Sequence, residues 1–242
     1  MGRIWQDNAL RICECQRHAV TPREGPKMFT TGASLFGLAA SMFILAMVSR
    51  NGAAEPVSHA ITLLQKGTTS ERRHATEVLA QIGDQRAAPA LAQALRDDDA
   101  LVRETAEQAL WSVWHRSGKL EVDARLHDGI MAMQRGAFDE AVAIFTEVIE
   151  MAPDFAEGYN KRATTYYLMQ EYEKSIRDCD KTIALNSVHF GALSGAGLCY
   201  LGLRNLPKAL DYFERALAVN PNMQQIQSYV EEIKKFLRDQ ST

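Results

Sequence analysis

A spacing of 34 residues recurs through the C-terminal half of the sequence and limits the possible folds more than any other feature. Small, aromatic and proline positions keep this spacing in a fixed order. The registers are Gly129, Ala163 and Gly197; Phe145, Cys179 and Phe213; and Pro153, Ser187 and Pro221. Such a period indicates helix pairs stacked in a row, because each pair buries its apolar face only against its neighbours. We therefore expect an all-α solenoid.

The composition excludes several classes of function. With 242 residues, 46% of them hydrophobic, the chain can bury a sizeable core. A formal net charge of −3 and dispersed arginines argue against a nucleic-acid partner. The six histidines lack metal-ligand spacing, and no HExxH, GxSxG or phosphate-binding glycine loop occurs. The sequence thus predicts a protein that is not an enzyme and that has no catalytic residue, cofactor or metal.

An uncharged stretch lies between Lys27 and Arg50, and its central part, Leu35–Val48, is almost wholly apolar. A helix of this length would rise about 33 Å, close to the thickness of a bilayer core. We expect a basic arm over residues 1–27, then a transmembrane anchor or a cleaved signal peptide over residues 28–54. Both alternatives place the repeats on the non-cytoplasmic side, in a single-pass membrane protein or an exported, periplasmic one. A buried soluble helix is the third alternative.

A shorter period of 31 residues precedes the longer one. It relates Arg72 to Arg103, Ala75 to Ala106, and Leu79 to Leu110. The stretch SERRHATEVLAQIGDQRAAPALAQAL resembles HEAT-like repeats, such as those of phycobilin lyases. The resemblance implies stacked helix pairs over residues 57–117. It also leaves an alternative function open, that of an accessory subunit of a cofactor- or tetrapyrrole-handling enzyme, although a shared fold does not establish a shared function.

Three smaller features carry expectations of their own. Asp97–Asp99 is interpreted as a solvated turn whose last acid caps the next helix, with a cation site as the alternative. Trp111 and Trp114 are expected to seal the junction between the two kinds of repeat; otherwise they would form an aromatic shelf for a ligand. Cys179 is expected to be a small core residue, and a disulfide with Cys199 stays open if the chain is exported.

The 34-residue registers hold the residues of tetratricopeptide repeats, which this part of the chain resembles. The third repeat matches the family pattern at Leu193, Gly197, Tyr200, Ala209, Phe213, Ala216 and Pro221. The resemblance implies three units within residues 120–221, at about 120–153, 154–187 and 188–221, and a capping helix over residues 222–238. The second and third repeats are also similar to a group of small exported bacterial repeat proteins of unknown function.

In this family, the first helix of each repeat lines a concave face on which extended or helical peptides bind. The residues that the resemblance assigns to this groove are Leu126, Ile130, Met133, Asn160, Thr164, Tyr167, Ser194, Leu198 and Leu201. This mainly apolar surface suits an amphipathic helix or an apolar peptide. We expect a scaffold that binds a protein or peptide partner during assembly of a membrane or envelope complex. Alternatively, the C-terminal helix folds back over part of the groove.

Some members of the family hold the C-terminal carboxylate of a chaperone with a clamp of lysine, asparagine and arginine. The corresponding positions of the first and third repeats hold Leu126, Ile130, Gly191 and Gly195 here. The sequence therefore disfavours a chaperone-tail adaptor.

Overall fold

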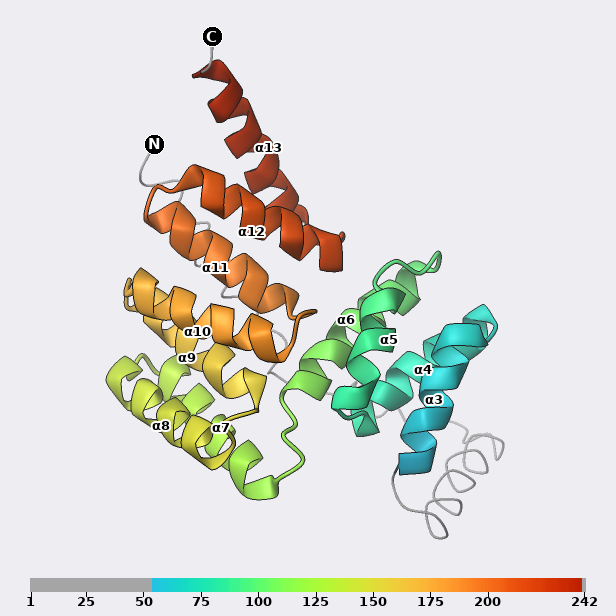
Figure 1. Cartoon of the computed structure of the whole chain (residues 1–242). Coiled ribbons are helices and arrows are strands. Elements are labelled where there is room, and N and C mark those ends of the chain that lie inside the picture. The colour runs from blue at the N-terminus through green and yellow to red at the C-terminus, as the bar shows by residue number, and fades with distance from the viewer. Residues whose placement is uncertain (1–53, 241–242) are drawn as a thin grey trace, which may run out of the picture.

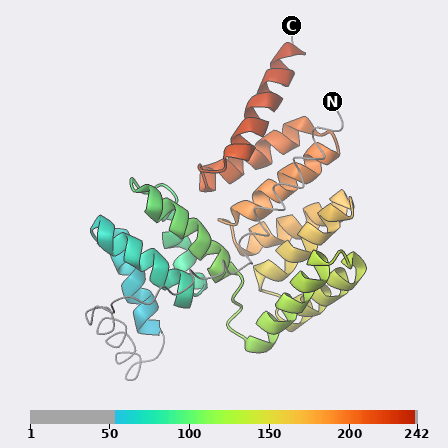
Figure 2. The same ribbon diagram turned by 180° about the vertical axis from the view of Figure 1, so that it is seen from behind.

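The computed structural model describes residues 54–240, and every regular element in that range is a helix. The expected all-α solenoid is confirmed, and its helices form two lobes that are visible from both sides (Figures 1 and 2). The predicted basic arm and the predicted anchor or signal peptide lie outside the described residues. Within residues 54–240, no helix combines the length and apolar character that crossing a membrane requires.

The first lobe, which we call the HEAT lobe, contains the helices before residue 115. They are α3 (Ala54–Lys66), α4 (Thr69–Ile82), the 3-10 turn η1 (Gln85–Ala87), α5 (Ala88–Ala94) and α6 (Ala100–Trp114). Thr68 starts α4 with a reciprocal capping box to Glu71, which satisfies two backbone donors at once. The helices enclose a core in which Leu79, Leu91 and Leu110 are fully buried.

The acidic turn before α6 behaves as the sequence predicts. Asp99 accepts a hydrogen bond from the backbone N–H of Val102 at 3.0 Å and so caps the helix. Arg73 donates to the same carboxylate and holds its pKa down to about 2. Arg72 binds Asp97 through both Nε and Nη2, at 2.6 and 2.8 Å. The 31-residue period therefore places arginines of α4 against the turn that begins the next repeat.

The second lobe, which we call the array, contains three helix pairs and a final helix. They are α7 (Leu120–Gln134) with α8 (Phe138–Met151), α9 (Ala156–Leu168) with α10 (Tyr172–Leu185), α11 (Phe190–Gly202) with α12 (Leu206–Val219), and α13 (Gln224–Asp239). Each helix packs on the next along the chain (Figure 1). Ile226, Tyr229 and Ile233 of α13 bury the end of the array in one cluster with Phe213.

Close helix contacts explain the small residues of the 34-residue registers. A Cβ on Gly129 or Gly197 would collide with the ring of Phe145 or Phe213, respectively. In the second repeat, Ala163 and Cys179 belong to one small buried cluster. Ala163 is larger than the glycine of the other repeats, and Cys179 is smaller than their phenylalanine. The space between the two helices therefore stays filled.

The second repeat also contains a buried polar chain. Ser175 Oγ donates to the carbonyl of Ala163 at 2.8 Å, and Cys199 Sγ donates to Ser175 Oγ at 3.1 Å. Cys179 and Cys199 are both free and buried, so the structure supports the core interpretation rather than the disulfide. Burial raises the pKa of Cys199 to about 12 and raises that of Cys179 as well.

The two lobes touch where the loop after α12 meets α5 and α6. Asn222 Nδ2 donates to the carbonyl of Leu95 at 2.8 Å, and Asn220 Nδ2 donates to Glu107 at 3.1 Å. Arg96 reaches the carbonyl of Val219 at 3.0 Å. This loop contact joins the HEAT lobe to the last repeat of the array rather than to the first.

Candidate peptide-binding groove

The nine predicted groove residues fall into two sets in the structure. Five are buried, namely Leu126, Ile130, Asn160, Ser194 and Leu198. Four are partly exposed, namely Met133, Thr164, Tyr167 and Leu201. The residues of the buried set are covered by other parts of the chain in this conformation. Only the second set offers surface to a ligand, so the groove stays a prediction that now rests mainly on those four residues.

Three of the partly exposed residues form what we call the apolar stripe, Met133, Tyr167 and Leu201. They lie 34 residues apart, and each is the penultimate residue of its helix, α7, α9 or α11. Tyr167 and Leu201 also pack against the cluster that contains residues of α13. The C-terminal helix therefore shares the apolar surface next to the stripe, while the stripe residues keep part of their surface exposed.

The other end of the groove face carries a buried carboxylate. Glu157 is 1% exposed and lies in the first turn of α9. Lys161, one turn further along, approaches its Oε1 at 3.1 Å. Asn160, a predicted groove residue, donates to Glu157 at 3.2 and 3.3 Å. The three polar side chains of α9 therefore satisfy one another.

His189 joins this group from the N-terminus of α11. Its Nδ1 accepts a hydrogen bond from the backbone N–H of Ala192 at 3.0 Å, which places the ring proton of the neutral tautomer on Nε2. Nε2 then donates to Glu157 Oε2 at 3.1 Å. The ring of Trp114 stacks on His189 at 4.1 Å between centroids.

The last turn of α6 faces the same carboxylate. His115 Nδ1 lies 2.6 Å from the carbonyl of Trp111, which can only accept, so this nitrogen carries a proton. Its Nε2 lies 3.5 Å from Glu157 Oε1. Burial, followed by the charge of Lys161, lowers the pKa of His115. Burial raises the pKa of Glu157, but Lys161, His115 and His189 outweigh it and hold this pKa well below its ordinary range.

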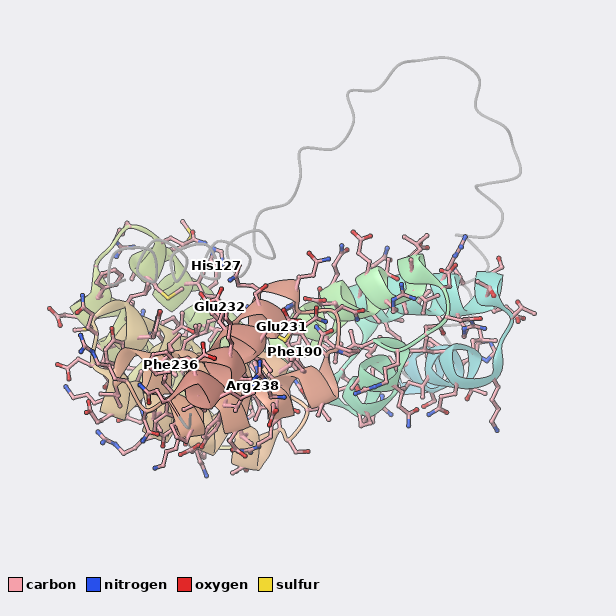
Figure 3. All side chains as sticks on the ribbon, turned by 90° about the horizontal axis from the view of Figure 1, so that it is seen from above. His127, Phe190, Glu231, Glu232, Phe236 and Arg238 are labelled. Atoms are coloured by element: carbon pink, nitrogen blue, oxygen red, sulfur yellow. The ribbon has the colours of Figure 1, made fainter. Side chains whose placement is uncertain are left out.

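The prediction that Trp111 and Trp114 seal the junction between the repeat types is confirmed. Trp111 meets His189 and Phe190 edge-on, with centroids at 5.7 and 5.4 Å, and Phe190 lies where the two lobes meet (Figure 3). The sequence does not predict Glu157 as the centre of this junction. In the sequence, it looks like an ordinary acid in the first turn of a helix, where acids are favoured by the helix dipole.

Comparison with known proteins agrees with the two lobes. The family model described as HEAT repeats matches residues 39–111, and the model described as tetratricopeptide repeat matches residues 192–223. The chain thus combines HEAT repeats with tetratricopeptide repeats. Within residues 54–240, no group of three His, Cys, Asp or Glu residues is placed to hold a metal ion.

Similar repeat proteins occur in distant organisms. A TPR repeat-containing protein of Rhizobium etli is 27% identical over 77% of this chain and 87% of its own length. Tetratricopeptide repeat protein 12 of Homo sapiens is 26% identical over 49% of this chain, and the Hsp70-Hsp90 organizing protein of Triticum aestivum is 27% identical over 44%. The chain spans less than a fifth of the human and wheat proteins, because the matches cover 17% and 18% of their lengths.

Solved tetratricopeptide domains resemble part of the array. The first such domain of Spaghetti (RPAP3), bound to an HSP90 peptide, matches 48% of this chain and 93% of that chain, with 24% identity and a TM-score of 0.47. The Sgt2 domain from Aspergillus fumigatus matches 51% of this chain and 83% of that chain, with 20% identity and a TM-score of 0.48.

Proposed function

We propose that this protein is a non-enzymatic scaffold that binds an apolar or amphipathic segment of a partner protein along the apolar stripe. The observation that carries the proposal is that Met133, Tyr167 and Leu201 occupy equivalent positions in the first helices of three successive repeats and remain partly exposed. A row of apolar anchors at even spacing matches the way that a groove receives one face of an amphipathic helix or an extended peptide. Solenoid repeats supply such extended surfaces by stacking.

The residues at the positions of the chaperone clamp favour this ligand over an acidic chaperone tail. Leu126 and Ile130 are apolar and buried, and Gly191 and Gly195 have no side chain to donate hydrogen bonds. A carboxylate in the groove would therefore lack the charged donors that a clamp provides. We accordingly expect affinity to come from burial of apolar surface rather than from ion pairs.

A pair of matched substitutions tests the stripe. Leu201→Asp places a charge on the stripe, whereas Met151→Asp places one at an exposed apolar residue, 41% exposed, at the end of α8. We expect partners crosslinked to the protein in its native cells to be lost with Leu201→Asp and with Tyr167→Ala, and retained with Met151→Asp. Thermal melting of each variant checks that the array is folded. Partners that survive both stripe substitutions would overturn the proposal.

We further propose that the partner belongs to a membrane or envelope complex and that residues 28–54 anchor or export the protein. Only the apolar run in the sequence supports this part. Membrane vesicles prepared with the cytoplasmic face outward provide the test, together with the mass of the mature chain. Protection of the C-terminal array from added protease is the expected result, and digestion without detergent would contradict it.

A further inference from the structure

We infer that the groove contains an aromatic-recognition pocket at the end opposite the apolar stripe, and that Trp111 of the same chain fills it until an aromatic side chain of a partner takes its place. We call it the Trp111 pocket, and its walls in the array are Lys161, His189, Phe190 and Gly191. The inference rests on the proposed function, because it assigns an aromatic anchor to the partner segment in the groove.

The geometry around Trp111 is that of an aromatic cage. Trp114, His189 and Phe190 meet the indole edge-on at interplanar angles of 85°, 82° and 85°. The ammonium of Lys161 lies 5.9 Å from the ring centroid, within the range of a cation–π interaction. This combination selects an aromatic ring over an aliphatic side chain of similar volume.

Gly191 provides the space that the indole occupies. A Cβ at this position would lie 2.5 Å from Trp111 Cη2 and 3.3 Å from Cζ2. Gly191 precedes the predicted groove residue Ser194 by three positions, and Glu157 precedes Asn160 by three, so both lie on the groove side of their helices. The pocket therefore lies on the side of α9 and α11 to which the resemblance assigns the groove, where Asn160 and Ser194 are buried in this conformation.

The polar walls of the pocket are paired within the array. Glu157 bonds to Lys161 and Asn160 of the same helix, α9, and His189 is fixed by Glu157 and by its own backbone. A partner that displaces Trp111 would consequently leave no charged group of the array unpaired. This lowers the free-energy cost of replacing the indole with a ring of the partner.

On the α6 side of the junction, the hydrogen-bonding groups are less completely paired. The indole N–H of Trp114 is buried without a hydrogen-bond partner, and Trp111 itself is only partly buried. The HEAT lobe is also held independently by the loop contact at Asn220 and Asn222. This loop contact does not involve Trp111, so we expect it to keep the lobes joined when the indole leaves the pocket.

Displacement of Trp111 can be measured on the intact protein. The probe is a synthetic peptide with the sequence of residues 108–119, QALWSVWHRSGK, and the control peptide has alanine at both tryptophans. We expect the tryptophan peptide to bind the full-length Trp111→Ala variant at least tenfold more tightly than it binds the wild-type protein, because the tethered competitor is gone. Lys161→Met in the same background should weaken this binding. Equal binding of the two peptides, or none, would overturn the inference.

A second measurement is made on the wild-type protein. Labelling with 5-fluorotryptophan gives a resonance for each of the three tryptophans, and the spectrum of Trp111→Phe identifies the one from Trp111. Excess tryptophan peptide should shift the Trp111 resonance toward the position of a solvent-exposed tryptophan. An unchanged resonance at saturating peptide would identify Trp111 as a permanent part of the interface and refute the inference. Leu201→Asp should leave this shift intact, so failure of the stripe and failure of the pocket give different results.

Discussion

Gly197 and Phe213 approach so closely that a Cβ on the glycine would lie 2.5 Å from the phenylalanine ring. The two residues belong to the paired helices α11 and α12 of the third repeat. Substitution to leucine has to displace a ring that is fully buried, and overpacking of this kind costs about 1 to 3 kcal/mol. We therefore expect Gly197→Leu to lower the free energy of unfolding and the melting temperature.

Gly195, two residues earlier in the same helix, supplies the control for this prediction. A Cβ there would meet only Cys179 Sγ, at an ordinary contact distance of 3.5 Å. Gly195→Ala should leave the stability unchanged or raise it by up to about 1 kcal/mol, since alanine favours helix over glycine. Equal losses in Gly195→Ala and Gly197→Leu would contradict the packing described for this repeat.

The second repeat makes a converse prediction, because Ala163 and Cys179 stand where the other repeats have glycine and phenylalanine. Cys179→Phe alone should destabilise the protein, since Ala163 leaves no room for the ring. Adding Ala163→Gly should recover part of the loss, with a coupling energy of about 0.5 to 3 kcal/mol in a double-mutant cycle of denaturant unfolding. Strict additivity of the two substitutions would show that these positions do not compensate each other.

Left-handed residues in the turns within the helix pairs give a third prediction. Gly136, Gln170 and Arg204 occupy equivalent turns and have φ values of 80°, 62° and 58°. Only the first is the residue type that adopts this conformation without steric cost. Arg204→Gly should therefore stabilise the chain, by up to about 1 kcal/mol.

Arg177→Gly, at an exposed position inside α10, is the matched control for the turn variant. This substitution removes the same side chain from a right-handed helix and should lower the free energy of unfolding by about 1 kcal/mol. Chemical denaturation of both variants provides the comparison. A loss of stability in Arg204→Gly would mean that the arginine side chain contributes more than the strain costs.

The junction between the lobes should weaken in mild acid. Burial and Lys161 lower the pKa of His115 in the folded protein, whereas the unfolded chain has the ordinary value of about 6.5. Below that value the unfolded state binds more protons, so the free energy of unfolding decreases as the pH falls toward the lowered pKa. Glu157, whose pKa is also lowered, contributes in a separate window at more acidic pH.

Comparison of wild type with His115→Gln isolates this effect, because the other histidines are common to both proteins. The wild-type melting temperature should fall more steeply between pH 7 and pH 5, with a slope that corresponds to at most about 1.4 kcal/mol per pH unit. Identical slopes would show that His115 does not titrate differently in the folded and unfolded states.

Local pattern predicted the helices and their packing registers because these depend on residues close in sequence or one repeat apart. Gly129 and Gly197 could be assigned to tight helix contacts from spacing alone, and Asp99 could be assigned to a cap from its place before an apolar helical run. Trp111 and Trp114 could also be assigned to the junction, since they lie between the residues of the two periods.

The depth of the groove could not be predicted from the same information. Leu126, Ser194 and Leu198 have the helical positions of groove residues, yet they are buried, since burial depends on which other parts of the chain cover each face. Glu157 gives no sequence signal that distinguishes it from a solvent-exposed acid. Its role depends on His115 and His189, which lie 42 residues before it and 32 after it in the sequence and meet it only after both lobes have packed.

The loop contact of Asn222 with Leu95 also limits how this protein can evolve. Solenoids commonly lengthen or shorten by duplicating or losing whole repeats, because each unit touches only its neighbours. Here a duplicated unit between α7 and α12 would carry Asn220 and Asn222 away from α5 and α6 and break the hydrogen bonds to Leu95 and Glu107. The contact with the HEAT lobe therefore forms with three repeats, and a change in the number of repeats would break it.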